Sequence, residues 1–214
     1  MIRRSSMNDK FYALPREKQK RIINAGFSVF AKNTYKKSPV NEIALEAGIS
    51  KSLLFFYFKN KKELYLFLLK TVEEITNKAL KESGAYEGED IFDIMYKGLM
   101  TKARLMKAYP DMSRFSLKAY YEKDPDLSRE IGKIVSPYTR IETYKALPPM
   151  DPKKFKDGID LNMMYRDIFL ASEGFFWRIE QGDNFSEDEF VSEYKKLIDF
   201  WKSVYLKEEG WKCT

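Results

Sequence analysis

Apolar residues recur along most of this chain at the three- to four-residue spacing of an amphipathic helix. In the first segment, Ile22, Phe27 and Phe30 fall on one helical face. No segment alternates apolar and polar residues as a half-buried strand does. The chain is therefore predicted to be all-α, with about nine helices near residues 16–33, 40–47, 51–57, 61–83, 89–108, 110–122, 125–146, 160–181 and 187–207.

Helix-terminal residues support these boundaries. Pro125 suits the first turn of a helix, and Asp124 before it suits the cap. Ser186 and Glu189 have the spacing of a capping box. Pro137 falls inside an otherwise periodic segment, so we expect that helix to be kinked or split there.

Two of the predicted helices, near residues 40–47 and 51–57, are very short and are joined by Gly48-Ile49-Ser50. A link of this length is typical of a helix-turn-helix, in which two helices cross steeply through a turn of three or four residues. Gly48 is expected to take a positive φ, and Ser50 is expected to cap the second helix. An ordinary helical hairpin would use the same residues.

The charge of the chain is concentrated at its N-terminal end. The formal net charge is +6, yet residues 1–62 hold 14 Lys and Arg against four acidic residues, and the other 152 residues hold 24 against 28. Such an asymmetry favours a polyanionic partner for the first 62 residues. A lysine-rich face that only keeps the protein in solution would give the same count.

Several classes of chemistry are excluded by what the 214 residues lack. There is no histidine, and Cys213 is the one cysteine, which removes histidine-based nucleophiles, histidine-ligated zinc and disulfide frameworks. Glycine-rich phosphate-binding motifs and spaced catalytic carboxylates are also missing from the sequence. We therefore expect a binding protein that is not an enzyme, with no catalytic residues, metal or cofactor.

The sequence has no run of about 18 apolar residues and no apolar signal-peptide core at its N-terminus. We expect a cytoplasmic protein with no membrane partner. The length allows either one large domain or a small module joined to a larger one.

The strongest motif covers residues 16–66, where apolar, small and basic residues follow a long fixed pattern. The chain there resembles the N-terminal domain of TetR-type (TetR/AcrR) transcriptional regulators. The resemblance implies a three-helix DNA-binding domain with a basic N-terminal arm over residues 1–62, and a helical ligand-binding and dimerisation domain over residues 63–214. The matching positions are Ile22, Phe27, Phe30, Ala31, Tyr35, Ser38, Val40, Glu42, Ile43, Ala44, Ala47, Gly48, Ile49, Ser50, Lys51, Leu54, Phe58, Lys61 and Leu64.

The resemblance also implies which residues contact a double-stranded DNA operator. Ser38 is expected to cap the helix near 40–47 and to meet a phosphate, with Pro39 at the first helical position. Lys51 and Ser52 open the recognition helix, whose N-terminal residues reach base edges in the major groove. The other predicted contacts are Leu53, Phe55, Phe56, Tyr57 and Lys61. Phosphate affinity is expected to rest on Lys51, Lys61, Lys36, Lys37 and the Arg3-Arg4 arm.

Three positions depart from the family pattern. Leu53 stands where threonine is frequent and Phe55 where tyrosine is usual, so two hydroxyl groups are missing. Leu53 is expected to contact a thymine methyl group instead. Thr34 replaces the usual glycine after the first helix, which leaves Asn33 as the residue expected to adopt the left-handed conformation.

The residues after 62 are rich in methionine and aromatic side chains, which form cores and also line adaptable apolar cavities. The resemblance implies a small apolar or amphipathic effector among the middle helices. Arg104 and Glu173 are expected to orient a polar group of that effector, although both also suit the surface. The predicted effector-binding residues are Met100, Arg104, Phe115, Tyr121, Tyr138, Phe169, Glu173 and Trp177.

The last two helices carry wide apolar faces, which we interpret as a homodimer interface. The expected function is a dimeric, ligand-responsive repressor that reads a roughly palindromic operator. The alternative is a DNA-tethered activator or protein-interaction module on the same fold. The apolar residues assigned to the interface are Met163, Met164, Ile168, Phe169, Phe175, Phe176, Phe190, Leu197, Ile198, Trp201 and Tyr205.

Overall fold

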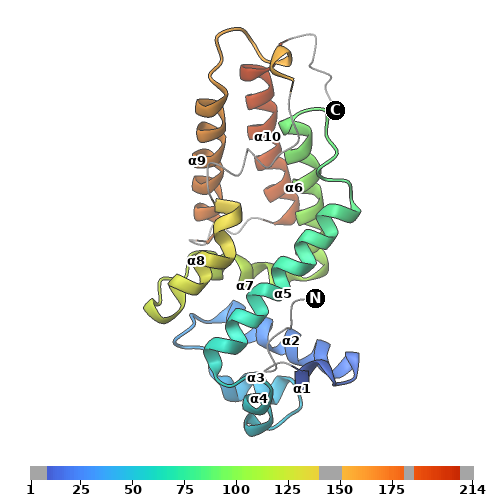
Figure 1. The fold of residues 1–214 in the computed structure, drawn as a ribbon, viewed down its shortest axis with the longest axis vertical. Helices are drawn as coiled ribbons and strands as arrows, with labels where there is room; N and C mark the ends of the chain where they lie inside the picture. The colour runs from blue at the N-terminus through green and yellow to red at the C-terminus, as the bar shows by residue number, and fades with distance from the viewer. Residues whose placement is uncertain (1–8, 140–150, 181–185, 208–214) are drawn as a thin grey trace. The chain divides into compact units, whose positions relative to one another are not determined.

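The structure, a computed structural model, describes residues 9–139, 151–180 and 186–207, and these residues are mostly helical (Figure 1). Apart from one short 3-10 helix, η2 (Pro152–Lys154), and a single bridge between Phe155 and Leu206, the regular structure in these ranges is α-helix. The all-α prediction is confirmed. The helices are α1 (Asp9–Tyr12), α2 (Arg16–Lys32), α3 (Val40–Glu46), α4 (Lys51–Tyr57), α5 (Lys61–Glu82), α6 (Ile91–Ala108), α7 (Pro110–Tyr120), α8 (Pro125–Thr139), α9 (Leu161–Glu180) and α10 (Glu187–Tyr205).

The predicted helices correspond to α2 through α10, and the described residues add α1 and the short η2. The capping box at Ser186 is confirmed, because the Glu189 amide donates to Ser186 Oγ at 3.2 Å and the Ser186 amide donates to Glu189 Oε2 at 2.8 Å. The expected split at Pro137 does not occur, since α8 runs unbroken to Thr139. The predicted extension of this helix to residue 146 lies outside the described residues.

The chain divides into two compact units. Unit 1 holds the described residues up to 74 together with 109–135, and unit 2 holds 75–108 with the described residues from 136 onward. Among the described helices, none combines the length and the apolar character needed to cross a membrane. The predicted functional division after residue 62 stays a prediction.

An aromatic cluster forms the centre of unit 1. Phe115 of α7 is fully buried, and its ring lies 4.9 Å from that of Tyr65 in α5 and 5.4 Å from that of Phe27 in α2. Edge-to-face and tilted aromatic pairs of this kind add to the large apolar area that each ring removes from water. The cluster therefore ties α7 to α2 and α5.

Unit 2 is built around α10, which lies between α6 and α9 (Figure 1). Trp201 is 2% exposed at the centre of its core. Polar contacts join the same helices: Lys202 pairs with Asp93 of α6 at 3.0 Å, and the hydroxyls of Tyr194 and Ser172 lie 2.8 Å apart between α10 and α9. Unit 2 thus has a core of its own.

The predicted interface faces on α9 and α10 need correction. Met164, Ile168, Phe190, Ile198 and Trp201 are buried in the core of unit 2. Phe175 and Phe176 of α9 and Leu197 and Tyr205 of α10 are partly buried and pack against that core, because an amphipathic helix turns its apolar face toward the core of its own unit. The exposed large apolar residues of these two helices are Met163, Leu170, Trp177, Phe200 and Val204.

Candidate nucleic-acid interface

The turn between α3 and α4 has the geometry expected of a helix-turn-helix. Gly48 has φ of 66°, its amide donates to the Leu45 carbonyl at 3.0 Å, and the Ile49 amide donates to the Ala44 carbonyl at 3.0 Å. These two bonds form a Schellman motif, which places the glycine in the left-handed conformation. Ser50 Oγ then accepts a hydrogen bond from the Leu53 amide at 3.2 Å and caps α4. The predictions for Gly48 and Ser50 are confirmed.

Helix α4 is buried on one side and exposed at its N-terminal end. Leu54 and the following Phe58 are buried and hold the helix against its neighbours. Lys51 and Ser52 are exposed at its N-terminal end, while Leu53 and Phe55 are half-buried. The polar N-terminal end of α4 is therefore open to a partner.

Two of the aromatic side chains on α4 lie under lysine ammonium groups. Phe56 is 54% exposed, and Lys10 Nζ lies 3.9 Å from the centre of its ring. Lys51 Nζ lies 5.9 Å from the centre of the Phe55 ring. Cation–π contacts at exposed sites contribute about 0.5–1 kcal/mol each. They hold positive charge against α4.

Lys10 belongs to α1, which the apolar periodicity did not reveal. Phe11 beside it is fully buried, with its ring 5.1 Å from those of Phe58 and Phe67. A buried phenylalanine anchors this single turn, and the anchor sets Lys10 against the recognition helix. The available signal was one aromatic residue among polar neighbours, which is too little to predict a helix.

Ser38 and Tyr57, both predicted to contact DNA, are 2% and 5% exposed. Ser38 does not cap α3, because its hydroxyl donates to the Thr34 carbonyl at 2.8 Å. Pro39, expected at the first helical position, is instead the N-cap residue of α3, with no side-chain cap. The loop before α3 closes on itself and uses the hydroxyl internally.

The expectation for Asn33 is also wrong. Asn33 has φ of −123° and ψ of 158°, which is extended backbone. Its amide and its Nδ2 both donate to the Val29 carbonyl, at 3.3 and 3.1 Å. The chain leaves α2 without a left-handed residue because these bonds satisfy the end of the helix.

Lys61 lies at the start of α5 and meets the same loop. Its Nζ donates to the Lys36 carbonyl at 3.1 Å and lies 4.8 Å from the centre of the Tyr35 ring. Burial lowers the pKa of the Lys61 ammonium, and the negative charge of Asp124 opposes that change. Burial, followed by the charge of Asp124, raises the pKa of the Tyr35 phenol. Lys61 therefore helps to position the loop before α3.

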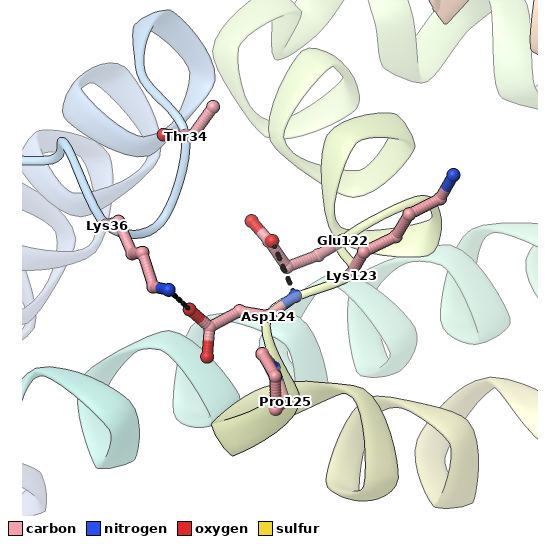
Figure 2. A pocket seen from close by; sticks show the side chains of 6 residues that line it. All are labelled: Thr34, Lys36, Glu122, Lys123, Asp124 and Pro125. Carbon is pink, nitrogen blue, oxygen red and sulfur yellow. Dashed lines mark hydrogen bonds and ion pairs between the residues drawn. The ribbon is translucent and has the colours of Figure 1, made fainter.

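The turn between α7 and α8 supplies two carboxylates to this loop (Figure 2). Glu122 Oε2 accepts a hydrogen bond from the Tyr35 amide at 3.3 Å, and Asp124 Oδ2 lies 3.6 Å from Lys36 Nζ. The sequence did not suggest this contact, because its partners are nearly ninety residues apart. A cavity of about 240 Å³ is lined by Thr34, Lys36, Glu122, Lys123, Asp124 and Pro125.

The predicted effector-binding residues are distributed over both units. Phe115 and Tyr121 belong to unit 1, and Phe115 lies in its core. The other five with described side chains belong to unit 2: Met100 and Arg104 on α6, and Phe169, Glu173 and Trp177 on α9. Trp177 is 40% exposed.

Three predicted residues cannot be placed in this geometry. Tyr138 belongs to α8, but its side chain is outside the described residues. Arg3 and Arg4 of the basic arm are also outside them. Their proposed roles rest on the sequence alone.

Comparison with known proteins supports the resemblance seen in the sequence. The family described as "Bacterial regulatory proteins, tetR family" matches residues 22–67, which include α3, α4 and the start of α5. The chain is 40% identical over 159 residues to the fatty acid metabolism regulator protein of Bacillus subtilis (strain 168), an alignment covering 72% of this chain and 79% of that protein.

Two solved structures share the fold at low identity. A TetR family transcriptional regulator from Chloroflexus aurantiacus J-10-fl superposes with a TM-score of 0.66 at 19% identity, covering 94% of this chain and 98% of that one. The transcriptional regulator FadR from Bacillus subtilis, in complex with stearoyl-CoA, gives 0.61 at 18% identity, covering 85% and 96%. These two structures share the fold. The family match and the 40% identical relative establish that this chain belongs to the TetR family of bacterial transcriptional regulators.

Proposed function

We propose that this regulator is a homodimeric repressor that binds a roughly palindromic operator through α3 and α4 and leaves it when a long-chain fatty acyl ligand binds. The observation that carries the proposal is the exposed, lysine-flanked N-terminal end of α4 in a chain 40% identical to a fatty acid metabolism regulator. Residues 1–62 bind DNA in this scheme, and residues 63–214 bind the effector and dimerise. Such a regulator acts in the cytoplasm, beside its operator.

Recognition of DNA combines base contacts with phosphate contacts. Ser52 and Leu53 at the start of α4 read base edges, Lys51 beside them binds a phosphate, and the exposed ring of Phe56 adds apolar contact. Lysines beside this helix bind phosphates, which fix the position of the domain but carry no sequence information. Lys10, held over Phe56, joins this phosphate-binding set.

The other predicted residues contribute to DNA binding less directly: Ser38, Pro39, Phe55, Tyr57 and Lys61. Ser38 and Tyr57 are buried, so their main effect is to shape the surface on either side of α4. Lys61 is half-buried and adds charge beside the loop. Pro39 and Phe55 are also half-buried and contribute edge contacts.

Dimerisation uses the exposed apolar residues of α9 and α10. Met163, Leu170 and Trp177 are 59%, 54% and 40% exposed and recur every seven residues on α9, so they lie along one side of the helix. Phe200 and Val204 are one turn apart on α10 and are 59% and 37% exposed. Large apolar side chains grouped in this way are typical of an isologous two-fold interface.

The dimer explains how one short helix gains specificity. Two copies of α4 related by a two-fold axis read two half-sites about 34–36 Å apart. A ligand that favours a different spacing of these helices weakens DNA binding, by no more than its differential affinity for the two states.

The proposed effector is an amphipathic acyl chain. Methionine and aromatic side chains among the candidates suit a long apolar chain, and Arg104 and Glu173 suit its polar end. A structurally similar regulator has been crystallised with stearoyl-CoA, which makes that thioester the first ligand to test. The candidates for one site are the predicted residues of unit 2, namely Met100, Arg104, Tyr138, Phe169, Glu173 and Trp177.

The test is titration of the purified chain against DNA from upstream of its own gene and against a scrambled duplex, by fluorescence anisotropy. We expect preference for the upstream DNA by about a thousandfold or more. Stearoyl-CoA should then release the protein, whereas coenzyme A alone should not.

Two outcomes contradict the proposal. A preference of only a few-fold for upstream DNA favours the DNA-tethered activator or interaction module. Tighter DNA binding in the presence of stearoyl-CoA contradicts ligand-released repression. Substitution of Lys107, an exposed lysine on α6, by alanine is the control that should leave DNA affinity unchanged.

A further inference from the structure

The Asp124 carboxylate is buried but incompletely satisfied. Its side chain is 3% exposed, and its Oδ1 accepts the Asp126 amide at 2.9 Å, which caps α8. Within the described residues, Oδ2 accepts no hydrogen bond, and its charged neighbour is Lys36 Nζ at 3.6 Å (Figure 2). Lys36 is therefore the ion-pair partner of this carboxylate, and the charge of Lys61 also acts on it.

Lys36 is placed very differently from its partner. Its side chain is 78% exposed, and it lies in the loop that leads into α3, next to Lys37 and close to Ser38. The loop is thus one of the basic edges from which phosphate contacts are expected. A DNA phosphate and Asp124 compete for the same ammonium group.

Separation of Lys36 from Asp124 costs more free energy than the exposure of Lys36 alone would suggest. An ion pair between two exposed groups contributes only about 0–1 kcal/mol. Here, however, removal of Lys36 leaves the desolvated Oδ2 without its ion-pair partner and with the charge of Lys61 as a remaining favourable interaction, and such a loss is more costly than the pair itself is favourable. Transfer of Lys36 to a phosphate is therefore opposed by the cost of leaving the Asp124 carboxylate without its partner, and not by a cost at the exposed lysine.

Glu122 keeps the two groups within reach of each other. Its Oε1 accepts the Asp124 amide at 3.0 Å and its Oε2 accepts the Tyr35 amide at 3.3 Å. One carboxylate thus bridges the turn that carries Asp124 and the loop that carries Lys36. The bridge limits how far Lys36 can move toward DNA while the contact to Asp124 is kept.

We propose that Asp124 withholds Lys36 from the DNA backbone and so sets the number of phosphates that the regulator neutralises. The inference rests on the proposed DNA binding by α3 and α4 and concerns the regulation of that site. By linkage, DNA binding and the closed contact between the α7–α8 turn and the loop oppose each other. The regulator binds its operator less tightly than its lysines alone would allow.

The test compares Asp124→Asn with Asp126→Asn in DNA binding over a series of salt concentrations. The amide side chain of Asp124→Asn keeps the cap of α8 but no longer holds Lys36, so the slope of log K against log salt should steepen by about 0.9 for each half-site, and affinity at 0.1 M salt should rise about five- to tenfold for each half-site. Asp126 is exposed, and Asp126→Asn removes the same charge from the same turn without releasing Lys36. This control variant should keep the slope of the unsubstituted protein.

Lys36→Ala completes the experiment as a double-mutant cycle. In the Asp124→Asn background it should remove the added slope of about 0.9 for each half-site, and in the otherwise unsubstituted protein it should remove clearly less. If Asp124→Asn folds poorly, Lys36→Ala alone still decides, since the loss of a full unit would mean that Lys36 already binds a phosphate.

The outcomes separate this inference from the proposed function. Specific DNA binding by the unsubstituted protein, with equal slopes for Asp124→Asn and Asp126→Asn, overturns the role of Asp124 and leaves the operator function standing. A loss of affinity in Asp124→Asn at unchanged slope also overturns it and assigns Asp124 a structural role. Failure of the unsubstituted protein to bind DNA rejects both.

Discussion

The two compact units are built from the same kind of amphipathic helix, yet they present different surfaces. Unit 1 carries 20 basic against 12 acidic residues, and unit 2 carries 18 against 20. The exposed apolar residues of α9 and α10 in unit 2 lie in rows, whereas the exposed Phe56 of unit 1 lies beneath a lysine. The buried apolar faces of the helices specify the fold of each unit, and the exposed faces are where the two units differ.

This difference is the basis of the proposed division of function. A net positive surface with polar groups at a helix N-terminus suits the phosphates and base edges of DNA. Rows of exposed methionine, leucine and aromatic side chains suit a second apolar surface. Substitutions confined to one unit should therefore change one property and leave the other intact.

The largest expected effect comes from the core of unit 1. Phe115→Ala removes a fully buried ring that contacts Phe27, Phe30 and Tyr65, and it should lower the free energy of unfolding by about 3–5 kcal/mol. Urea denaturation measures this loss. Tyr109→Ala, at a 49% exposed position of the same unit, should change it by less than about 0.5 kcal/mol. A small effect at Phe115 would mean that α7 is not packed as described.

The next effect tests the surface of unit 2. Leu170→Asp places a charge in the middle of the exposed apolar row of α9 and should weaken the dimer by about 2 kcal/mol or more, roughly thirtyfold in dissociation constant. Sedimentation equilibrium gives that constant. Leu45→Asp is the matched control, because Leu45 is 79% exposed on α3 of unit 1. Equal dimerisation of both variants would exclude α9 from the interface.

Smaller changes in stability are expected at two glycines, one in each unit. Gly48 has φ of 66° with no atom within 4 Å of an added Cβ, so Gly48→Ala should cost about 1–2 kcal/mol from backbone conformation alone. Gly174 lies inside α9, where an added Cβ also meets no atom within 4 Å, and Gly174→Ala should stabilise the protein by up to about 1 kcal/mol. Thermal unfolding of both variants should give opposite shifts, and shifts of the same sign would refute the assigned turn.

Sequence reasoning predicted the parts of the fold that depend on neighbouring residues. Helical periodicity placed α2 through α10, and the chemistry of Gly48 and Ser50 identified the turn of the helix-turn-helix. These features are local, because a glycine with positive φ and a serine cap act within a few residues. The same reasoning was wrong at Asn33 and Ser38, where each side chain donates to a backbone carbonyl four residues earlier, an alternative that is equally local and that the sequence does not distinguish from the predicted one.

Contacts between distant parts of the chain could not be predicted in this way. Glu122 and Tyr35 meet across 87 positions, and no single-sequence pattern links them. The burial of Met164 and Trp201 likewise depends on α10 lying between two other helices. An apolar face has the same appearance in a sequence whether it meets its own core or a second subunit, which is why the interface residues had to be reassigned.

The most direct test of the central claim is the salt dependence of binding to upstream DNA by the unsubstituted dimer and by Lys51→Ala. The account predicts a steep negative slope of log K against log salt, which becomes shallower by about 0.9 for each half-site that loses its Lys51 contact. A slope near zero, or one that Lys51→Ala leaves unchanged, would contradict DNA binding by the exposed end of α4.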